Sequence, residues 1–238
     1  MPFITNRDRL PIQHRLSVYA KRQWEYTIEE YPSNRLAISI DDLKAHLRLP
    51  DSTIYDNELE LYILSAQDAF ETASGITILS TKFRTYREYL GQDWLLRKRP
   101  VTEIHEISID GEILDSNSYS LRKLSQYGYA WANPKCDYDF SEYCDCDCCD
   151  DLSVYIDFTA GLAVDSTILK ENYPDVYHAL LTIAARFYTD RGDCEGDDCT
   201  CMGGRSIPKI AASIITKYKN ISITINNSIN DIDFCHRC

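Results

Sequence analysis

The chain has 238 residues, is 44% hydrophobic and carries a formal net charge of −12 at pH 7. That length and apolar content are enough to bury one core of ordinary size, and no Gly/Ser-rich linker divides the sequence, so we expect one domain with extensions. The longest apolar runs are far shorter than the roughly 20 residues that span a bilayer, and the first ten residues lack the apolar stretch of a signal peptide, which argues against membrane insertion and secretion.

The first third of the chain carries the pattern of two consecutive helices. Ser39 is a candidate N-cap, and Asp42 stands three residues later, as in a variant capping box. Asp56 is a candidate cap of the second helix, and Gly75 supplies the left-handed residue that ends it. Apolar residues recur on one face of this second helix, at Leu59, Tyr62, Ile63, Ala66, Ala69, Phe70 and Ala73. We therefore predict a helical hairpin whose apolar face lies in the core.

The middle of the chain has the period of β-strands instead. Asp110 and Gly111 lie between two apolar runs and form a strong signal for a two-residue hairpin. Other segments are rich in the aromatic and β-branched residues that suit a pleated surface. The strands are expected at residues 83–90, 101–109, 119–124, 127–131 and 154–158. These segments predict a small, mostly antiparallel sheet.

Two more helices are predicted towards the C-terminus. Pro174 suits a first helical turn, and an apolar stripe follows it as far as residue 191. Pro208 is expected to open a last helix that ends near Tyr218. The isoleucines that follow alternate as in a strand, which could add to a sheet edge; they are Ile221, Ile223 and Ile225.

These elements predict an α+β fold, with a small bundle of about four helices, a small mostly antiparallel sheet, and extended N- and C-terminal arms. We place the arms at residues 1–38 and 219–238 and the domain at residues 39–218. Insertions rich in Cys and Asp interrupt the domain near residues 136–151 and 193–203. The N-terminal arm is either disordered or docked on a partner; its aromatic residues are the argument for docking, and both alternatives stay open.

Ten cysteines gather in three groups instead of scattering along the chain. Thiolates bind soft metals, four ligands close a structural zinc site, and residues 235–238 have the C-x-x-C spacing common in such sites. The candidate zinc ligands are Cys144, Cys146, Cys148, Cys149, Cys194, Cys199, Cys201, Cys235 and Cys238. Disulfides and free thiols remain open as alternatives, because thiols persist in a reducing cytosol and nearby pairs close in an oxidising medium.

Negative charge is concentrated in residues 136–201, which hold sixteen acidic residues against three basic ones. Such a block would repel a phosphate backbone, which argues against a protein that grips DNA through counterion release. It suits a channel through which DNA slides, and it equally suits a solvated acidic loop.

Sequence signatures of enzymes are absent. The chain has no G-x-S-x-G, P-loop, H-E-x-x-H or Rossmann glycine pattern. Its histidines are scattered, at His14, His46, His105, His178 and His236. A lone histidine without a recognisable partner is more often a packed or surface residue than a base, so we assign no catalytic residues and expect no enzyme.

Several of these segments together resemble one known family, the small head-to-tail connector (adaptor) proteins of tailed bacteriophages. The resembling segments are IDDLKAHLRL from Ile40, the ETASG ending at Gly75, RPV at residues 99–101, FTAG at residues 158–161 and the helix at residues 176–191. The resemblance covers residues 39–218, and the two arms and the cysteine-rich insertions depart from it.

The resemblance implies a structural protein of the virion neck that is assembled in the host bacterial cytoplasm. Copies would form a homo-oligomeric ring, typically of twelve subunits, that docks beneath the portal protein and contacts the next tail or connector protein. Double-stranded DNA would pass through the lumen without sequence-specific binding. The competing hypothesis is a cysteine-rich metal-binding or redox module on an unrelated α+β domain, and oligomeric state separates the two.

Overall fold

The computed structural model describes residues 25–87, 94–123, 125–134, 153–190 and 207–228. Within them the helices are α2 (Ile40–Leu47), the short 3-10 helix η2 (Thr53–Tyr55), α3 (Asp56–Ser74), α4 (Ser166–Asn172), α5 (Pro174–Thr189) and α6 (Lys209–Ser228). The strands are β1 (Glu25–Glu30), β2 (Thr81–Arg87), β3 (Trp94–Leu96), β4 (Val101–Ile109), β5 (Glu112–Ile113), β6 (Tyr119–Lys123), β7 (Ala130–Pro134) and β8 (Val154–Ala160). The predicted α+β class is confirmed.

The strands form two sheets instead of the single sheet expected. A five-stranded sheet has the order β1-β2-β8-β4-β5, a three-stranded sheet has the order β3-β7-β6, and neighbouring strands run antiparallel. Strand β3 was not predicted from the sequence, because three residues are too few to show the alternation of apolar and polar residues typical of a strand. Strand β1 belongs to the segment assigned to the N-terminal arm, yet it pairs with β2 of its own chain.

The predicted hairpin is confirmed between β4 and β5. Asp110 and Gly111 have φ angles of 50° and 86°, so both central residues lie in the left-handed region that a type I′ turn requires. The Asp110 carboxylate also accepts hydrogen bonds from the backbone N–H and the hydroxyl of Ser153, at 2.9 and 3.1 Å. The turn is thereby attached to the start of β8.

The helix ends follow the predicted signals in part. Ser39 caps α2, since its hydroxyl accepts the backbone N–H of Asp42 at 3.0 Å. The reciprocal half of the capping box is replaced, because the N–H of Ser39 donates to the Tyr177 hydroxyl at 3.2 Å. The prediction that Asp56 caps α3 is wrong: Asp56 is the first helical residue. Gly75 ends α3 with a φ of 73°, as predicted.

The predicted strand after Tyr218 is also wrong, because α6 continues through these isoleucines to Ser228. Between Lys209 and Ser228 the sequence has neither proline nor glycine that would stop a helix. The first half of α6 is held by burial of Ala211, Ile215 and Tyr218 in the helical core. β-branched residues only slightly disfavour a helix, so the anchored helix propagates through them.

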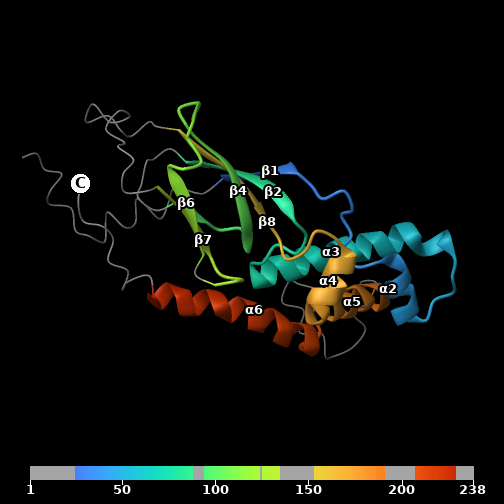
Figure 1. Ribbon diagram of the computed structural model, residues 1–238. Coiled ribbons are helices and arrows are strands. Elements are labelled where there is room, and N and C mark those ends of the chain that lie inside the picture. Colours follow the sequence, from blue (N-terminus) through green and yellow to red (C-terminus); the bar gives the residue numbers. More distant parts are fainter. Residues whose placement is uncertain (1–24, 88–93, 124, 135–152, 191–206, 229–238) are drawn as a thin grey trace, which may run out of the picture.

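The molecule has two hydrophobic cores placed end to end. One lies among the helices and includes Leu43, Ile63, Phe70, Leu180 and Ile183. The other lies between the two sheets and includes Trp94, Leu96, Ile107, Ile156 and Phe158. Figure 1 shows α2 to α5 at one end of the molecule and the strands at the other, with α6 running beneath both.

Arg99 joins the two ends. Its side chain is 2% exposed and donates only to backbone carbonyls. The partners are Ser74 at 2.6 Å and Gly75 at 3.1 Å, both at the end of α3, and Tyr127 at 3.1 Å and Tyr218 at 3.4 Å. A cation at a helix C-terminus is stabilised by the helix dipole and by carbonyls that lack helical partners. A single buried guanidinium therefore fixes α3, α6 and the loop before β7.

Candidate functional site

The candidate zinc ligands all lie outside the described residues, as do Cys136 and eleven of the sixteen acidic residues of segment 136–201. The zinc hypothesis and the acidic-channel hypothesis therefore stay predictions. Across the described ranges, no three His, Cys, Asp or Glu side chains gather closely enough to hold a metal ion. In the same ranges no helix combines the length and apolar character of a membrane span.

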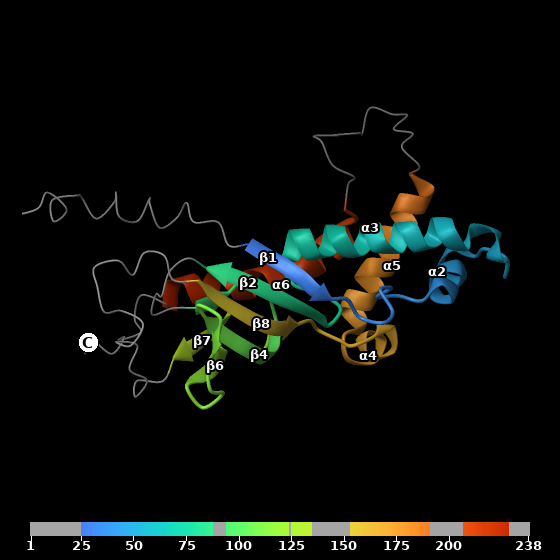
Figure 2. The ribbon, with the colours of Figure 1, turned by 90° about the horizontal axis from the view of Figure 1, so that it is seen from above.

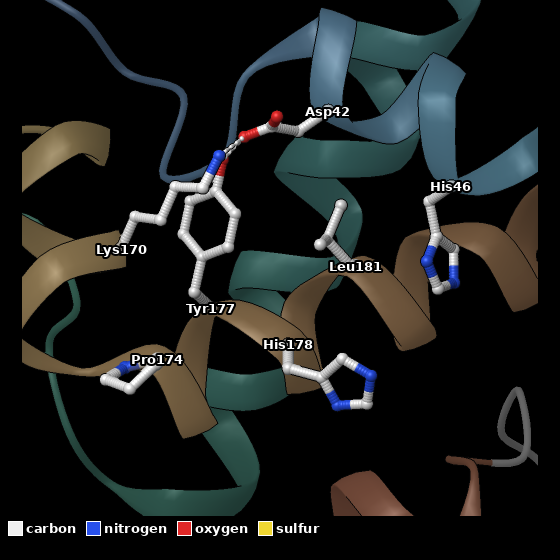
Figure 3. Close-up of a pocket in the computed structure, with 7 residues that line it drawn as sticks. All are labelled: Asp42, His46, Lys170, Pro174, Tyr177, His178 and Leu181. Atoms are coloured by element: carbon white, nitrogen blue, oxygen red, sulfur yellow. Dashed lines mark hydrogen bonds and ion pairs between the residues drawn. The ribbon is translucent and has the colours of Figure 1, made fainter.

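A polar cluster in the helical body lies where α2, α4 and α5 meet (Figure 3). One carboxylate oxygen of Asp42 accepts from the Lys170 ammonium at 2.7 Å and from the Tyr177 hydroxyl at 2.5 Å. Tyr177 in turn accepts the N–H of Ser39, as described above. Three helices are thus connected through one carboxylate.

The charges of this cluster stabilise one another. The hydrogen bond from Lys170 and then that from Tyr177 lower the pKa of Asp42 below its ordinary value. The same carboxylate raises the pKa of Lys170, and burial followed by the bond to Asp42 raises the pKa of Tyr177. Near neutral pH Asp42 is ionised and Tyr177 protonated, so the cluster joins the three helices by hydrogen bonds to a charged carboxylate.

The structure brings together two histidines that the sequence pattern treats as unrelated. His46 on α2 and His178 on α5 line one pocket with Asp42, Lys170 and Tyr177, and their ring centroids are 6.4 Å apart. The pocket holds about 370 Å³ and both histidines are exposed. No sequence spacing connects residues on helices so far apart in the chain, and only the packing of α2 against α5 reveals the pair.

A second hollow is an apolar groove of about 650 Å³ along the outer side of α3. Its lining comes from α3, the end of α5 and the start of the α6 segment, and includes Leu64, Asp68, Ala73, Phe187 and Ile207. Leu61, one turn nearer the start of α3, is 61% exposed. Within the described residues nothing covers the groove and Leu61, and such a face binds proteins more often than small molecules.

The first prediction concerns the Asp42 joint. Asp42→Asn should lower the free energy of unfolding by about 1 kcal/mol at neutral pH, because the joint is partly exposed and its ion pair is screened. A carboxyl whose pKa is lowered by folding contributes stability above its unfolded pKa, and this contribution is lost as the pH falls towards the folded pKa. Urea unfolding from pH 7 to pH 3 should therefore show the variant and the parent converging below about pH 4.

Asp41→Asn is the matched control, because Asp41 is an exposed carboxylate one residue away in the same helical turn. Its unfolding free energy should stay within about 0.5 kcal/mol of the parent at every pH. Equal stability of Asp42→Asn and the parent at pH 7 would show that the joint contributes nothing.

No protein-family model matches the chain, and no curated protein matches it. Solved structures do share its fold. A chain of "Virion of native gene transfer agent (GTA) particle" is similar with a TM-score of 0.61 and 18% identity, covering 82% of this chain and 94% of that chain.

Two neck structures give the same result. A chain of "Neck of empty GTA particle computed with C6 symmetry" has a TM-score of 0.61 and 17% identity, covering 82% of this chain and 95% of that chain. A chain of "Neck of native GTA particle computed with C12 symmetry" has a TM-score of 0.58 and 17% identity, covering 82% and 94%. At such low identity the likeness shows a shared fold and no more. The shared fold covers 94% to 95% of each of these matched chains and 82% of this chain.

Proposed function

We propose that this chain is a structural protein of the neck of a tailed phage-like particle, and that its copies form a closed ring between head and tail. The observation that carries the proposal is the shared fold, which extends over 94% to 95% of chains from gene transfer agent particles and their necks. Coverage on that scale includes both the helical body and the sheets, so the likeness does not depend on a common small motif.

The ring is supported by two further observations. The neck structures with this fold were computed with C6 and C12 symmetry, which are the symmetries of cyclic assemblies. Segments within residues 39–218 also resemble connector proteins, whose rings typically have twelve subunits. We therefore propose twelve copies, docked on a portal protein on one side and on the next connector or tail protein on the other.

In the proposed ring, the lumen would be the path of the DNA. Double-stranded DNA would pass through it during packaging and ejection, without sequence-specific contacts. The acidic residues in segment 136–201 would suit that passage, because like charge leaves the phosphate backbone free to move. If these carboxylates line the channel, their replacement by serine should slow DNA passage without changing ring assembly.

The test of the proposed function is assembly. The purified chain, alone and with the portal protein, should form rings that appear as twelvefold class averages in electron microscopy. Mass spectrometry of purified particles should detect the chain at about the abundance of the portal protein.

The competing module hypothesis gives a different outcome in the same experiments. It expects a monomer at every concentration, no chain in the particles, and bound metal by elemental analysis of protein purified under reducing conditions. A monomer with and without the portal protein, together with absence from particles, would refute the neck proposal.

A further inference from the structure

The two sheets pack against each other, so each has one outer face, and these faces point away from each other. Residues from both sheets share one core, including Phe83 and Ile156 from the five-stranded sheet and Trp94 and Ala132 from the three-stranded sheet. Figures 1 and 2 show β6 and β7 lying against one side of the layer formed by β2, β8 and β4. Along each strand, the side chains of the outer face alternate with the side chains that point into the shared core.

The outer face of the five-stranded sheet is rich in carboxylates. Glu30 pairs with Lys82, Thr159 with Glu103, and Asp157 with Glu106, which places these side chains on the same side of the sheet. Asp157 is neutralised by Arg84, which donates two hydrogen bonds to it at 2.7 and 2.8 Å. Glu30 and Glu103 are exposed. We call this surface the acidic face, defined by Glu30, Glu103, Glu106 and the Arg84–Asp157 pair; Lys82 also lies on it, so three carboxylates outside the pair face one lysine.

Two tyrosines lie on the acidic face as well. Tyr86 and Tyr155 are paired across β2 and β8, and their ring centroids are 5.0 Å apart. Tyr155 is 38% exposed, so part of a large aromatic ring lies open to solvent on this face. Tyrosine is among the residues that contribute most to protein interfaces.

The outer face of the three-stranded sheet has the opposite charge. Leu95, Trp131 and Arg122 lie in register across it, Trp131 is only 8% exposed, and Arg97 directly follows the end of β3. Arg97 and Arg122 are exposed. The strands Trp94–Leu96, Tyr119–Lys123 and Ala130–Pro134 contain no acidic residue. We call this surface the basic face, defined by Leu95, Arg97 and Arg122.

We propose that the basic face of one copy docks on the acidic face of the next copy, and that this contact closes the proposed ring. The inference rests on the proposed function and adds the contact surfaces to it. Two different faces on opposite sides of one domain make a heterologous contact, which repeats from copy to copy and forms a ring when the rotation closes. A contact between two like faces would instead stop at a dimer.

Charge and side-chain type both favour this pairing. Glu103 and Glu106 would face Arg97 and Arg122 across the interface, and such complementary charge fixes the orientation and speeds the encounter of the copies. Arginine also stacks on tyrosine rings, which assigns Tyr155 as a partner of an arginine on the next copy. The apolar groove along α3 is the competing candidate for the contact between copies. Its lining contains one acidic residue, Asp68, and no basic residue, so it lacks the complementary charge of the two sheet faces.

Charge reversal tests the proposal. Arg122→Glu and Glu103→Lys should each raise the dissociation constant of ring assembly at least tenfold, measured by mass photometry across a concentration series. Both residues are exposed, so circular dichroism and the melting temperature of the subunit should stay at the parent values. The double variant carrying both changes should regain rings, because every contact in a heterologous ring then has the two charges exchanged.

Glu60→Lys is the matched control, since Glu60 is an exposed carboxylate near the start of α3, and Figure 2 shows the α2 end of α3 away from the strands. It should assemble like the parent. Rings that persist in Arg122→Glu and Glu103→Lys overturn the assigned faces and leave the neck proposal standing, and loss of rings in Glu60→Lys alone moves the contact to α3. A parent chain that forms no ring, alone or with the portal protein, overturns both proposals.

Discussion

Arg99→Met is expected to lower the free energy of unfolding by about 3 kcal/mol or more. The four carbonyls that Arg99 satisfies lie at the junction of the two cores, and three of them belong to Ser74, the last residue of α3, and to Gly75 and Tyr127, which lie outside helices. Each buried carbonyl left without a donor costs about 1 to 3 kcal/mol, and methionine replaces the volume of the stem but none of the hydrogen bonds. Urea unfolding followed by circular dichroism measures the loss.

Two comparisons make the Arg99 result specific. Arg99→Lys keeps the charge but cannot reach four acceptors with one ammonium group, so its stability should lie between those of the parent and Arg99→Met. Lys209→Ala removes an exposed cation from α6 and should change the unfolding free energy by no more than about 0.5 kcal/mol. A loss in Arg99→Met as small as that of Lys209→Ala would show that the junction is held by packing alone.

Gly161→Ala is expected to destabilise the protein by at least about 3 kcal/mol, or to prevent folding. Gly161 follows β8 and donates its N–H to the carbonyl of Pro100 at 2.9 Å. A Cβ at this position would lie 2.5 Å from both the Cα and the N of Ser80. These are backbone atoms of the residue directly before β2, so no side-chain rotation can relieve the clash. The sheet would have to move away from the loop that joins it to the helices.

Gly111 provides the contrast for Gly161. A Cβ added at Gly111 would meet no atom within 4 Å. Glycine is favoured there only by the backbone conformation, with a φ of 86°. Gly111→Asn should therefore cost about 1 kcal/mol or less, because asparagine tolerates the left-handed region. Thermal unfolding of the two variants in parallel separates a steric requirement for glycine from a conformational one. Equal melting temperatures would contradict the close approach of Gly161 to Ser80.

The elements that were predicted correctly from the sequence are those whose signals are local. The apolar period of α3 and α5, the serine cap of α2, the glycine that ends α3 and the Asp-Gly turn between β4 and β5 were all predicted from neighbouring residues. Each depends on one turn or one face, and the chemistry that decides it lies within a few positions of the chain.

Features that depend on partners far apart in the chain became visible only in the folded structure. Strand β1 exists because β2 offers a free edge, and α6 extends through residues that read as a strand because its first half is anchored in the helical core. Asp42 faces Lys170 and Tyr177 instead of completing a capping box. In each case a contact across the fold outweighs a local preference of well under 1 kcal/mol per residue, which is why these features follow from packing and not from sequence pattern.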